Sequence, residues 1–369
     1  MTIDGEHHVD HCTTFGGRGS CRSFTSFMGL VICIAIFVKR ILDLLGYMDD
    51  SFSFDVEGNV MWYAPYHCYY PTKQAKLLEF WDEIGLPHEK PKQEYGRQLR
   101  ITGFVVDPNE MRVTMDNEDK TKLLERVADF THIAPHGTRR SLREFQQLAG
   151  WINWALNVFP LLKPGLSNIY DKISGKTESH AMIYVSKAVV DDLRWFYDHV
   201  EASFGVRIFE ATDWSIDEAD WTAYGDASAL GMGYYFVETR CGYQSQLPLD
   251  PPKDVIFYFE ALTILAIVEN VCLHTWLPKR LVIFSDNSNT VDIFSSLRAK
   301  PCYNMILKST VSLLIRHRID LRVVLIPGSD NVVADALSRF QNDRAISACP
   351  DLFISAFTPP RFTMWLPKK

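Results

Sequence analysis

Four acidic residues in the second half of the chain occupy ordered positions relative to the predicted strands and helices. Asp226 ends a strand that begins at Trp221, and Asp286 follows a continuous apolar strand. Glu260 interrupts an apolar helix, and Asp335 lies on the last predicted helix. Ligands of open α/β sheets gather at the carboxyl ends of the strands, so we expect these carboxylates to meet there.

The surroundings of Glu260 indicate what chemistry such a cluster could do. Its neighbours on the same helical face are all apolar, namely Ile256, Ile264, Ile267 and Val271. An unpaired carboxylate is costly to bury and would normally be neutral, so a divalent cation is the natural compensation. Four carboxylates around two cations about 4 Å apart would suit phosphodiester hydrolysis. Oxygen ligands favour Mg²⁺ or Mn²⁺ over Zn²⁺.

Each of these acidic residues also has an explanation that needs no metal. Asp286 and Asn287 could cap the following helix, and Glu260 could lie in a first helical turn, where the helix dipole favours acids. Asp335 could be a solvated helix residue, and Asp226 could form a turn. Their ordered appearance on strand, helix, strand and helix favours the metal site over unrelated coincidences.

The elements that would position the four acids form an α/β pattern between about residues 215 and 340. The predicted hairpin, helices and strands are, in chain order, Trp221–Asp226 with Gly233–Val237, Ile256–His274, Leu281–Ser285, Leu321–Ile326 and Asn331–Phe340. The uninterrupted apolar run at 281–285 is typical of a strand that is buried on both faces of a sheet.

Two regions precede this α/β pattern. One contains a hairpin with carboxylates at its tip, a helix at 72–84 and a strand at 99–106. The other is predicted to be mainly helical, and Ser141 with Glu144 forms a capping box that opens a long amphipathic helix. The predicted domains are therefore 1–115, 116–205 and 206–342, followed by a tail at 343–369.

One segment, Phe24–Val38, is strongly apolar. It is shorter than the roughly 20 apolar residues of a bilayer span, and it contains Thr25 and Ser26. A secretory signal could have this length, but Lys39 and Arg40 follow it instead of a small-residue cleavage site. We expect a buried core helix and no membrane partner, with a signal anchor as the alternative.

Composition narrows the class of protein. The 369 residues are 47% hydrophobic and 22% charged, which excludes disordered and fibrous chains. The 38 basic and 45 acidic residues give a net charge of −7, which excludes coating of nucleic acid by bulk charge and leaves a local basic groove possible. The eight cysteines are dispersed without a CxxC pair, which indicates an intracellular protein, cytoplasmic or nuclear, with no secretion signal.

The acidic motifs resemble the RNase H domain of retroelement reverse transcriptases. The matching segments are Tyr-Gly-Asp226-Ala-Ser, Phe-Glu260-Ala-Leu, Phe-Ser-Asp286-Asn and Asn331-Val-Val-Ala-Asp335-Ala-Leu-Ser-Arg. The ADALSR ending is similar to that of LTR-type and DIRS-like elements. The resemblance implies that the four acids bind two Mg²⁺ ions and cut the RNA strand of RNA–DNA hybrids. Many family members carry a histidine shortly before the last aspartate, which the segment 327–331 lacks.

The first 115 residues resemble the palm of the same polymerases. Tyr47-Met48-Asp49-Asp50 matches the palm motif Y-x-D-D, whose aspartates hold metal in the family. The resemblance assigns further contacts to the nucleotide, template or primer, through Gly16, Gly17, Arg18, Lys92 and Gly103.

The segment 141–172 resembles the thumb. Trp151 with the nearby Arg139 and Arg140 could hold a nucleic-acid backbone, although the neighbouring Trp154 could equally be core.

The resemblance therefore predicts an α/β chain, in which an α+β palm fragment and a helical thumb precede an RNase H-like mixed-sheet domain. Polymerisation in the family uses a third aspartate well upstream of the Gly/Arg loop, and only about fourteen residues precede that loop here. We expect a nuclease that acts on RNA–DNA hybrid or template–primer and lacks polymerase activity. The alternatives are an inactive transposon relic, a nucleic-acid-binding module or, less favoured, a recombinase or integrase.

Overall fold

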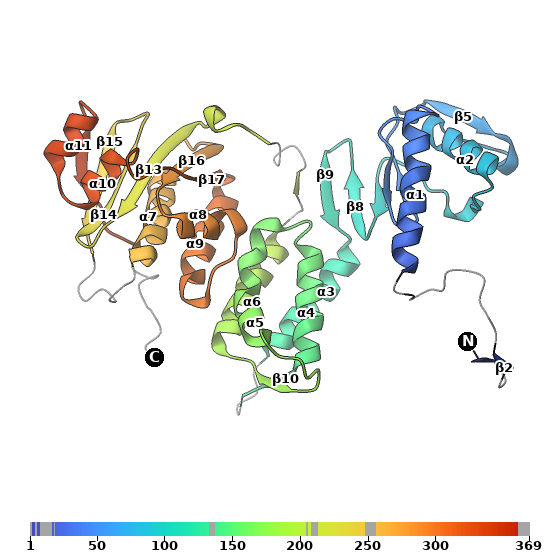
Figure 1. Ribbon diagram of the computed structural model, residues 1–369, viewed down its shortest axis with the longest axis horizontal. Coiled ribbons are helices and arrows are strands. Elements are labelled where there is room, and N and C mark those ends of the chain that lie inside the picture. Colours follow the sequence, from blue (N-terminus) through green and yellow to red (C-terminus); the bar gives the residue numbers. More distant parts are fainter. Residues whose placement is uncertain are drawn as a thin grey trace. The chain divides into compact units, whose positions relative to one another are not determined.

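The computed structural model describes residues 2–3, 6–7, 17, 19–132, 137–203, 206–207, 213–247 and 256–360 (Figure 1). The chain forms two compact units, Met1–Asp116 with Val206–Glu210, and Asn117–Gly205 with Ala211–Lys369. Both units combine helices with strands, which confirms the predicted α/β class. The second unit contains both the helical region and the larger sheet.

The described residues of the first unit form two α-helices, three two-stranded sheets and one four-stranded sheet in the order β12-β9-β8-β7. Its elements are β1 (Thr2–Ile3), β2 (Glu6–His7), α1 (Ser20–Phe37), β3 (Leu45–Tyr47), β4 (Asp50–Phe52), β5 (Val60–Tyr63), β6 (Cys68–Pro71), α2 (Thr72–Ile84), β7 (Leu99–Ile101), β8 (Phe104–Asp107), β9 (Arg112–Met115) and β12 (Val206–Arg207). The predicted helix at 72–84 is observed with these same bounds. The predicted acidic hairpin is observed as β3 and β4.

The strand expected at 99–106 is instead a hairpin of β7 and β8. Thr102 has φ of 49° and Gly103 has φ of 88°, both in the left-handed region. Two successive residues with positive φ make the tight turn whose twist matches paired antiparallel strands. The glycine was a turn signal that the strand prediction overlooked.

Helix α1 forms at the apolar segment, but it is not the buried core helix that we expected. Only Met28, Val31 and Ala35 of this helix are buried, and the last two belong to a core cluster with Leu77 and Phe80 of α2. The rest of the helix surface is largely accessible. Within the described residues, this is the one helix long and apolar enough to cross a membrane by length and composition.

The helical region of the second unit carries two short paired strands. Its elements are α3 (Asn117–Thr131), β10 (Arg139–Ser141), α4 (Leu142–Ala155), the 3₁₀ helix η3 (Pro160–Leu166), α5 (Ser167–Ile173), β11 (Met182–Tyr184) and α6 (Lys187–Ala202). The predicted capping box at the start of α4 is present, because the Ser141 and Glu144 side chains each accept a hydrogen bond from the other residue's backbone N–H.

A six-stranded mixed sheet forms the rest of the second unit. Its strands run in the order β17 (Asp320–Leu325), β16 (Arg280–Ser285), β13 (Trp221–Ala227), β14 (Gly231–Phe236), β15 (Cys241–Gln246) and β18 (Phe353–Ala356). β13 is parallel to β16 and antiparallel to β14. The interior strand β16 buries Leu281, Val282 and Ile283, as its apolar sequence predicts.

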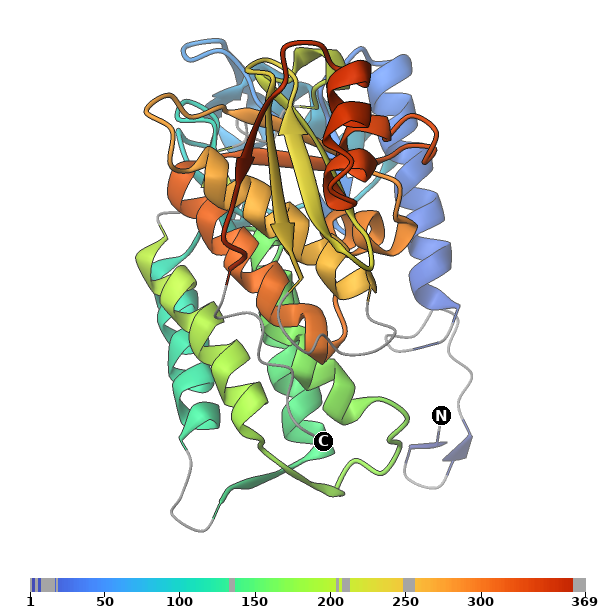
Figure 2. The same cartoon turned by 90° about the vertical axis from the view of Figure 1, so that its left-hand side faces the viewer.

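Helices cover both faces of this sheet (Figure 2). They are α7 (Ile256–Val271), α8 (Ser288–Ser296), α9 (Pro301–His317), α10 (Val332–Ser338) and α11 (Asn342–Ala348). A Cβ at Gly225 of β13 would contact Thr263 and Ile267 of α7, whereas one at Gly233 of β14 would meet Leu337 of α10. α7 and α10 therefore lie on opposite faces.

The segment predicted as a tail instead contributes α11 and β18. β18 pairs in parallel with β15 and extends the sheet edge. Leu352, just before β18, is buried with Leu337 and Ala345, and this burial stabilises the closing segment. Its sequence is short and contains prolines, so strand periodicity was too weak to predict it.

Candidate metal centre

Asp226 is positioned by the close packing of α10 on the sheet. It lies opposite Gly233 in the β13–β14 register, so both face α10. A Cβ at Gly233 would clash with the backbone nitrogen of Ser338, so only glycine admits the helix at this distance. The Ser338 hydroxyl then donates a hydrogen bond to the Asp226 carboxylate. The sequence analysis missed Ser338, although it stands three residues after Asp335.

Asp286 follows the carboxyl end of the interior strand β16. Of the two residues predicted as possible helix caps, Asn287 is the cap, because its side chain accepts a hydrogen bond from Thr290 N at 3.1 Å. A Cβ on Gly328, in the turn after β17, would lie 3.0 Å from Asp286 Oδ2. The lack of a side chain at Gly328 leaves room for the carboxylate.

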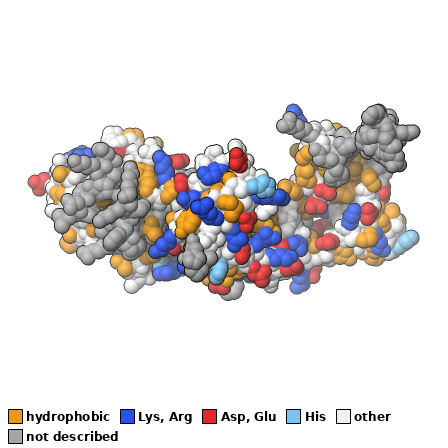
Figure 3. All heavy atoms as spheres, turned by 90° about the horizontal axis from the view of Figure 1, so that it is seen from below, with side chains coloured by type: hydrophobic (Ala, Val, Ile, Leu, Met, Phe, Trp, Pro, Cys, Tyr) orange, Lys and Arg blue, Asp and Glu red, His pale blue; other side chains and the backbone are white. Residues whose placement is uncertain are grey.

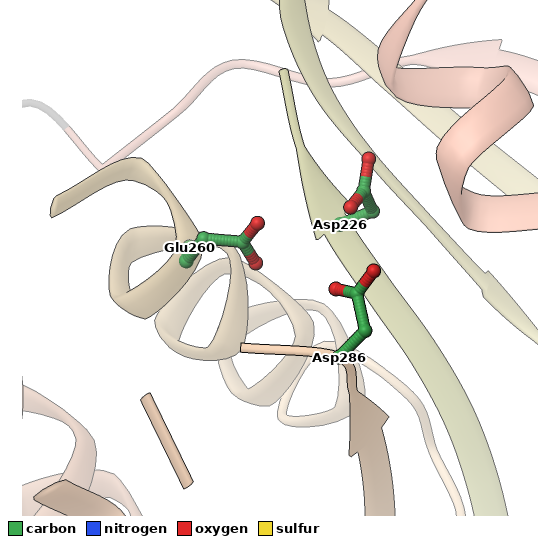
Figure 4. Close-up of side chains that lie close together, drawn as sticks. All are labelled: Asp226, Glu260 and Asp286. Carbon is green, nitrogen blue, oxygen red and sulfur yellow. The ribbon is translucent and has the colours of Figure 1, made fainter. Parts of the chain in front are cut away.

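Glu260 comes from α7, on which most residues are buried. Figure 4 shows its carboxylate directed toward those of Asp226 and Asp286. One ligand oxygen from each of the three residues lies within 4.8 Å of the others. Among the described residues, no other three His, Cys, Asp or Glu side chains gather in this way. The predicted convergence of these three acids is therefore observed.

Burial and mutual repulsion make this cluster costly without a cation. Burial, with the nearby charges of Asp286 and Asp335, raises the pKa of Asp226 to about 6. Burial, with the charges of Asp226 and Asp286, raises the pKa of Glu260 to about 9. Glu260 is only 5% exposed, so water cannot screen its charge well. Three oxygen donors of this kind match a hard divalent cation such as Mg²⁺ or Mn²⁺.

Asp335 is near this cluster but does not belong to the group of three. Its carboxylate accepts hydrogen bonds from Arg339 Nε at 2.7 Å and from an Arg344 amino group at 2.6 Å. These two arginines keep the pKa of Asp335 below its usual range even though partial burial raises it. Asp335 still raises the pKa of Asp226 through its charge. The sequence did not indicate that the fourth acid would be ion-paired.

Asn331 is a further residue that sequence reasoning did not single out for a role. It is fully buried, and its Nδ2 donates to the carbonyl of Gly225 at 3.1 Å. This bond joins the start of α10 to the strand that carries Asp226. Asn331 therefore sets the position of α10, and with it that of Asp335 and Ser338.

The Y-x-D-D residues lie on the exposed hairpin of β3 and β4. Tyr47 pairs with Asp50 across the hairpin, and Met48 has φ of 55° in its turn. All four residues, including Asp49, are exposed. Within the described part of the chain, no third metal-ligating side chain gathers with the two aspartates.

The other residues of the first unit that were predicted to contact nucleotide, template or primer do not form one site within the described part of the chain. Gly16 and Arg18 lie outside the described residues, and Gly17 is half-buried. Lys92 is exposed and pairs with Glu89 at 3.2 Å. Gly103 serves the β7–β8 turn.

The basic and aromatic candidates of the helical region are mostly engaged with protein groups. Arg140 pairs with Asp129 at 2.9 Å and with Glu144 at 3.3 Å. The guanidinium of Arg126 lies 4.6 Å from the centre of the half-buried Trp151 ring. Arg139 is exposed on β10. Figure 3 shows lysine and arginine side chains among acidic and hydrophobic ones over this region, in the middle of the view.

Comparisons with known proteins place the chain beside reverse transcriptase structures at low similarity. No protein-family model matches the chain, and no curated protein matches it. Three similar solved structures are the foamy viral protease-reverse transcriptase in complex with RNA/DNA hybrid, the same protein in complex with dsDNA, and its dRH form in complex with dsDNA. Each is 16% identical to this chain, with TM-scores of 0.40, 0.40 and 0.36 respectively.

The matches are partial in both directions. They cover 88%, 88% and 84% of this chain, in the same order. The chain spans only 40%, 62% and 50% of those proteins' chains.

Proposed function

We propose that the second unit is an RNase H-type nuclease that hydrolyses the RNA strand of RNA–DNA hybrids with two Mg²⁺ or Mn²⁺ ions. The observation that carries this proposal is the convergence of Asp226, Glu260 and Asp286 within 4.8 Å. Two of these acids are buried, and an arrangement so costly in electrostatic energy persists where a function requires it. The choice of RNA–DNA hybrid rests on the resemblance of the four acidic motifs.

The carboxylates would hold the ions, and their neighbours would hold the carboxylates. Asp226 is oriented by Ser338, and Glu260 is fixed on the buried helix α7. Asp335 would join as the fourth ligand by exchanging its arginine partners for a cation. When bound, a pair of ions can generate hydroxide and stabilise the leaving oxygen of a phosphodiester.

We propose in addition that the first unit derives from a reverse transcriptase palm and contacts template–primer. Its support is the hairpin that presents Asp49 and Asp50 at an exposed turn, together with the Y-x-D-D resemblance. The ADALSR resemblance supports an origin in an LTR-type or DIRS-like retroelement.

The second candidate function is binding of hybrid without cleavage. The contact that favours it is the double ion pair of Asp335 with Arg339 and Arg344, which satisfies the fourth acid without a metal. In this alternative, Asp226, Glu260 and Asp286 would be the remnant of a metal site that no longer supports cleavage.

The test uses purified full chain, an end-labelled RNA–DNA hybrid and Mg²⁺. We expect RNA cleavage that is abolished by EDTA and reduced at least about a hundredfold in Glu260→Gln, because a metal ligand is lost. Glu269→Gln, on the same helix but outside the cluster, is the matched control and should cleave normally. Hybrid binding without cleavage would favour the second candidate, and cleavage that is unchanged in Glu260→Gln would refute the proposed site.

A further inference from the structure

A cavity of about 130 Å³ lies within the second unit, where the helical region meets the loop between α8 and α9. Its polar lining comes from α4, η3, α5 and that loop, through Asn153, Lys163, Ser167, Tyr170 and Arg298. The volume has room for several water molecules or for one small polar group. None of these residues belongs to the acidic cluster.

Two cationic side chains face this cavity without an acidic partner. Within the described part of the chain, neither the half-buried Lys163 nor the exposed Arg298 forms an ion pair, whereas the half-buried Arg140 and the buried Lys308 do. Burial and the nearby charge of Arg298 lower the pKa of Lys163. Two like charges that converge on a cavity repel each other, and an anion between them would relieve that repulsion.

Neutral groups in the lining add a further hydrogen-bond donor. The Asn153 amide donates to the Tyr170 hydroxyl oxygen. Since that oxygen is already an acceptor, the hydroxyl hydrogen remains to donate to another group. Lys163, Arg298 and Tyr170 thus supply donors and a positive field for an anionic ligand with several acceptor oxygens.

The walls of the cavity are held by contacts that span the junction. Ser167 Oγ donates to the carbonyl of Ala299 at 2.8 Å. Beneath them, Asp192 of α6 and Lys308 of α9 form a buried ion pair at 2.7 Å. Asn304 joins both sides by donating to Asp192 and to the carbonyl of Pro164. A site with fixed walls loses little freedom on binding, so it can bind a small group with useful affinity.

We propose that this cavity binds one phosphate of a nucleic-acid backbone. The proposal rests on the proposed function, since the backbone would belong to the hybrid that the acidic cluster cuts. The two sites are joined by α8, because Asp286 immediately precedes the helix cap and Leu297 follows the helix. Its nine residues rise about 1.5 Å each, which separates the sites by roughly 14 Å.

This separation suits a duplex substrate. A strand advances about 3.4 Å along the duplex axis per nucleotide, so a strand held at the acidic cluster can reach the cavity with another of its phosphates. Holding that phosphate would fix the register of the duplex relative to Asp226, Glu260 and Asp286.

The experiment measures binding of a fluorescein-labelled RNA–DNA hybrid to the full chain in EDTA, over a range of salt concentrations. Lys163→Ala and Arg298→Ala should each weaken binding about tenfold, the loss expected for a charged hydrogen bond. The slope of log affinity against log salt should become shallower by about 0.9, because one fewer phosphate is neutralised. Lys163→Arg should restore binding, and Arg316→Ala, an exposed cation on α9, is the matched control.

The outcomes separate this proposal from the nuclease assignment. If the wild type binds hybrid without cutting it in Mg²⁺ and both alanine variants bind it more weakly, the phosphate site in the cavity is supported and the nuclease assignment is refuted. If hybrid is cut normally and both alanine variants bind it like the wild type, the phosphate site in the cavity is refuted and the nuclease assignment stands.

Two further outcomes would also overturn the cavity as a backbone-phosphate site. One is failure of the wild type to bind hybrid. The other is that inorganic phosphate binds the wild type but not Lys163→Ala, while the two proteins bind hybrid equally well. That result would identify a free phosphate group as the ligand.

Discussion

Replacing Glu260 with glutamine should stabilise the metal-free protein, and the gain should grow with pH. Burial raises the pKa of Glu260 from 4.5 to about 9, so the folded protein keeps a proton that the unfolded chain releases. Between these two values, stability of the wild type falls as pH rises, and the loss is complete above pH 9. The neutral amide has no such dependence.

The size of the effect follows from the width of that window. Each rise of one pH unit between 4.5 and 9 lowers the unfolding free energy of the wild type by about 1.4 kcal/mol. The loss is about 3 kcal/mol at pH 7 and about 6 kcal/mol at pH 9, both as upper values since the neighbouring acids titrate together. Glu260→Gln should therefore exceed the wild type in unfolding free energy by several kcal/mol at pH 9 and by much less at pH 5.

The assay is urea unfolding followed by tryptophan fluorescence at pH 5, 7 and 9, first in EDTA. Excess Mg²⁺ should then stabilise the wild type, by about 2.7 kcal/mol at a hundred times the dissociation constant, and should stabilise Glu260→Gln less. Glu178→Gln, at an exposed position, controls for the change of charge. A stability difference that does not change with pH, or a variant that is less stable at pH 9, would refute the electrostatic reasoning.

Three further predictions concern the groups around the cluster. Arg344→Ala removes a partner of Asp335 and a positive charge, so Mg²⁺ affinity measured by calorimetry should rise several-fold; weaker binding would contradict the ion-pair argument. Ser338→Ala removes the hydrogen bond that lowers the pKa of Asp226, so hybrid cleavage should need higher pH, and an unchanged pH profile would count against this role. Gly233→Ala places a Cβ against the Ser338 nitrogen and should destabilise the fold by about 1–3 kcal/mol in urea, whereas Gly29→Ala, where no atom lies within 4 Å, should not.

Much of the local structure could be predicted because it depends on neighbours in sequence. The capping box needs only Ser141 and Glu144, three residues apart, and the helix at 72–84 ends where Gly85 adopts φ of 70°. The continuous apolar run of β16 indicated burial on both faces. Predictions failed where exposure depended on packing, as in α1, or where a weak pattern was completed by pairing, as in β18.

The site itself shows the same division. The residue types and their order on strand, helix and strand were enough to select Asp226, Glu260 and Asp286. The reason is that the carboxyl ends of parallel strands lie at the same edge of a sheet, however the helices pack. The sequence could not reveal that Arg339 and Arg344 hold Asp335, or that Lys163 and Arg298, 135 residues apart, face one cavity. Those contacts depend on side-chain directions and on how distant segments pack, and only the tertiary structure fixes both.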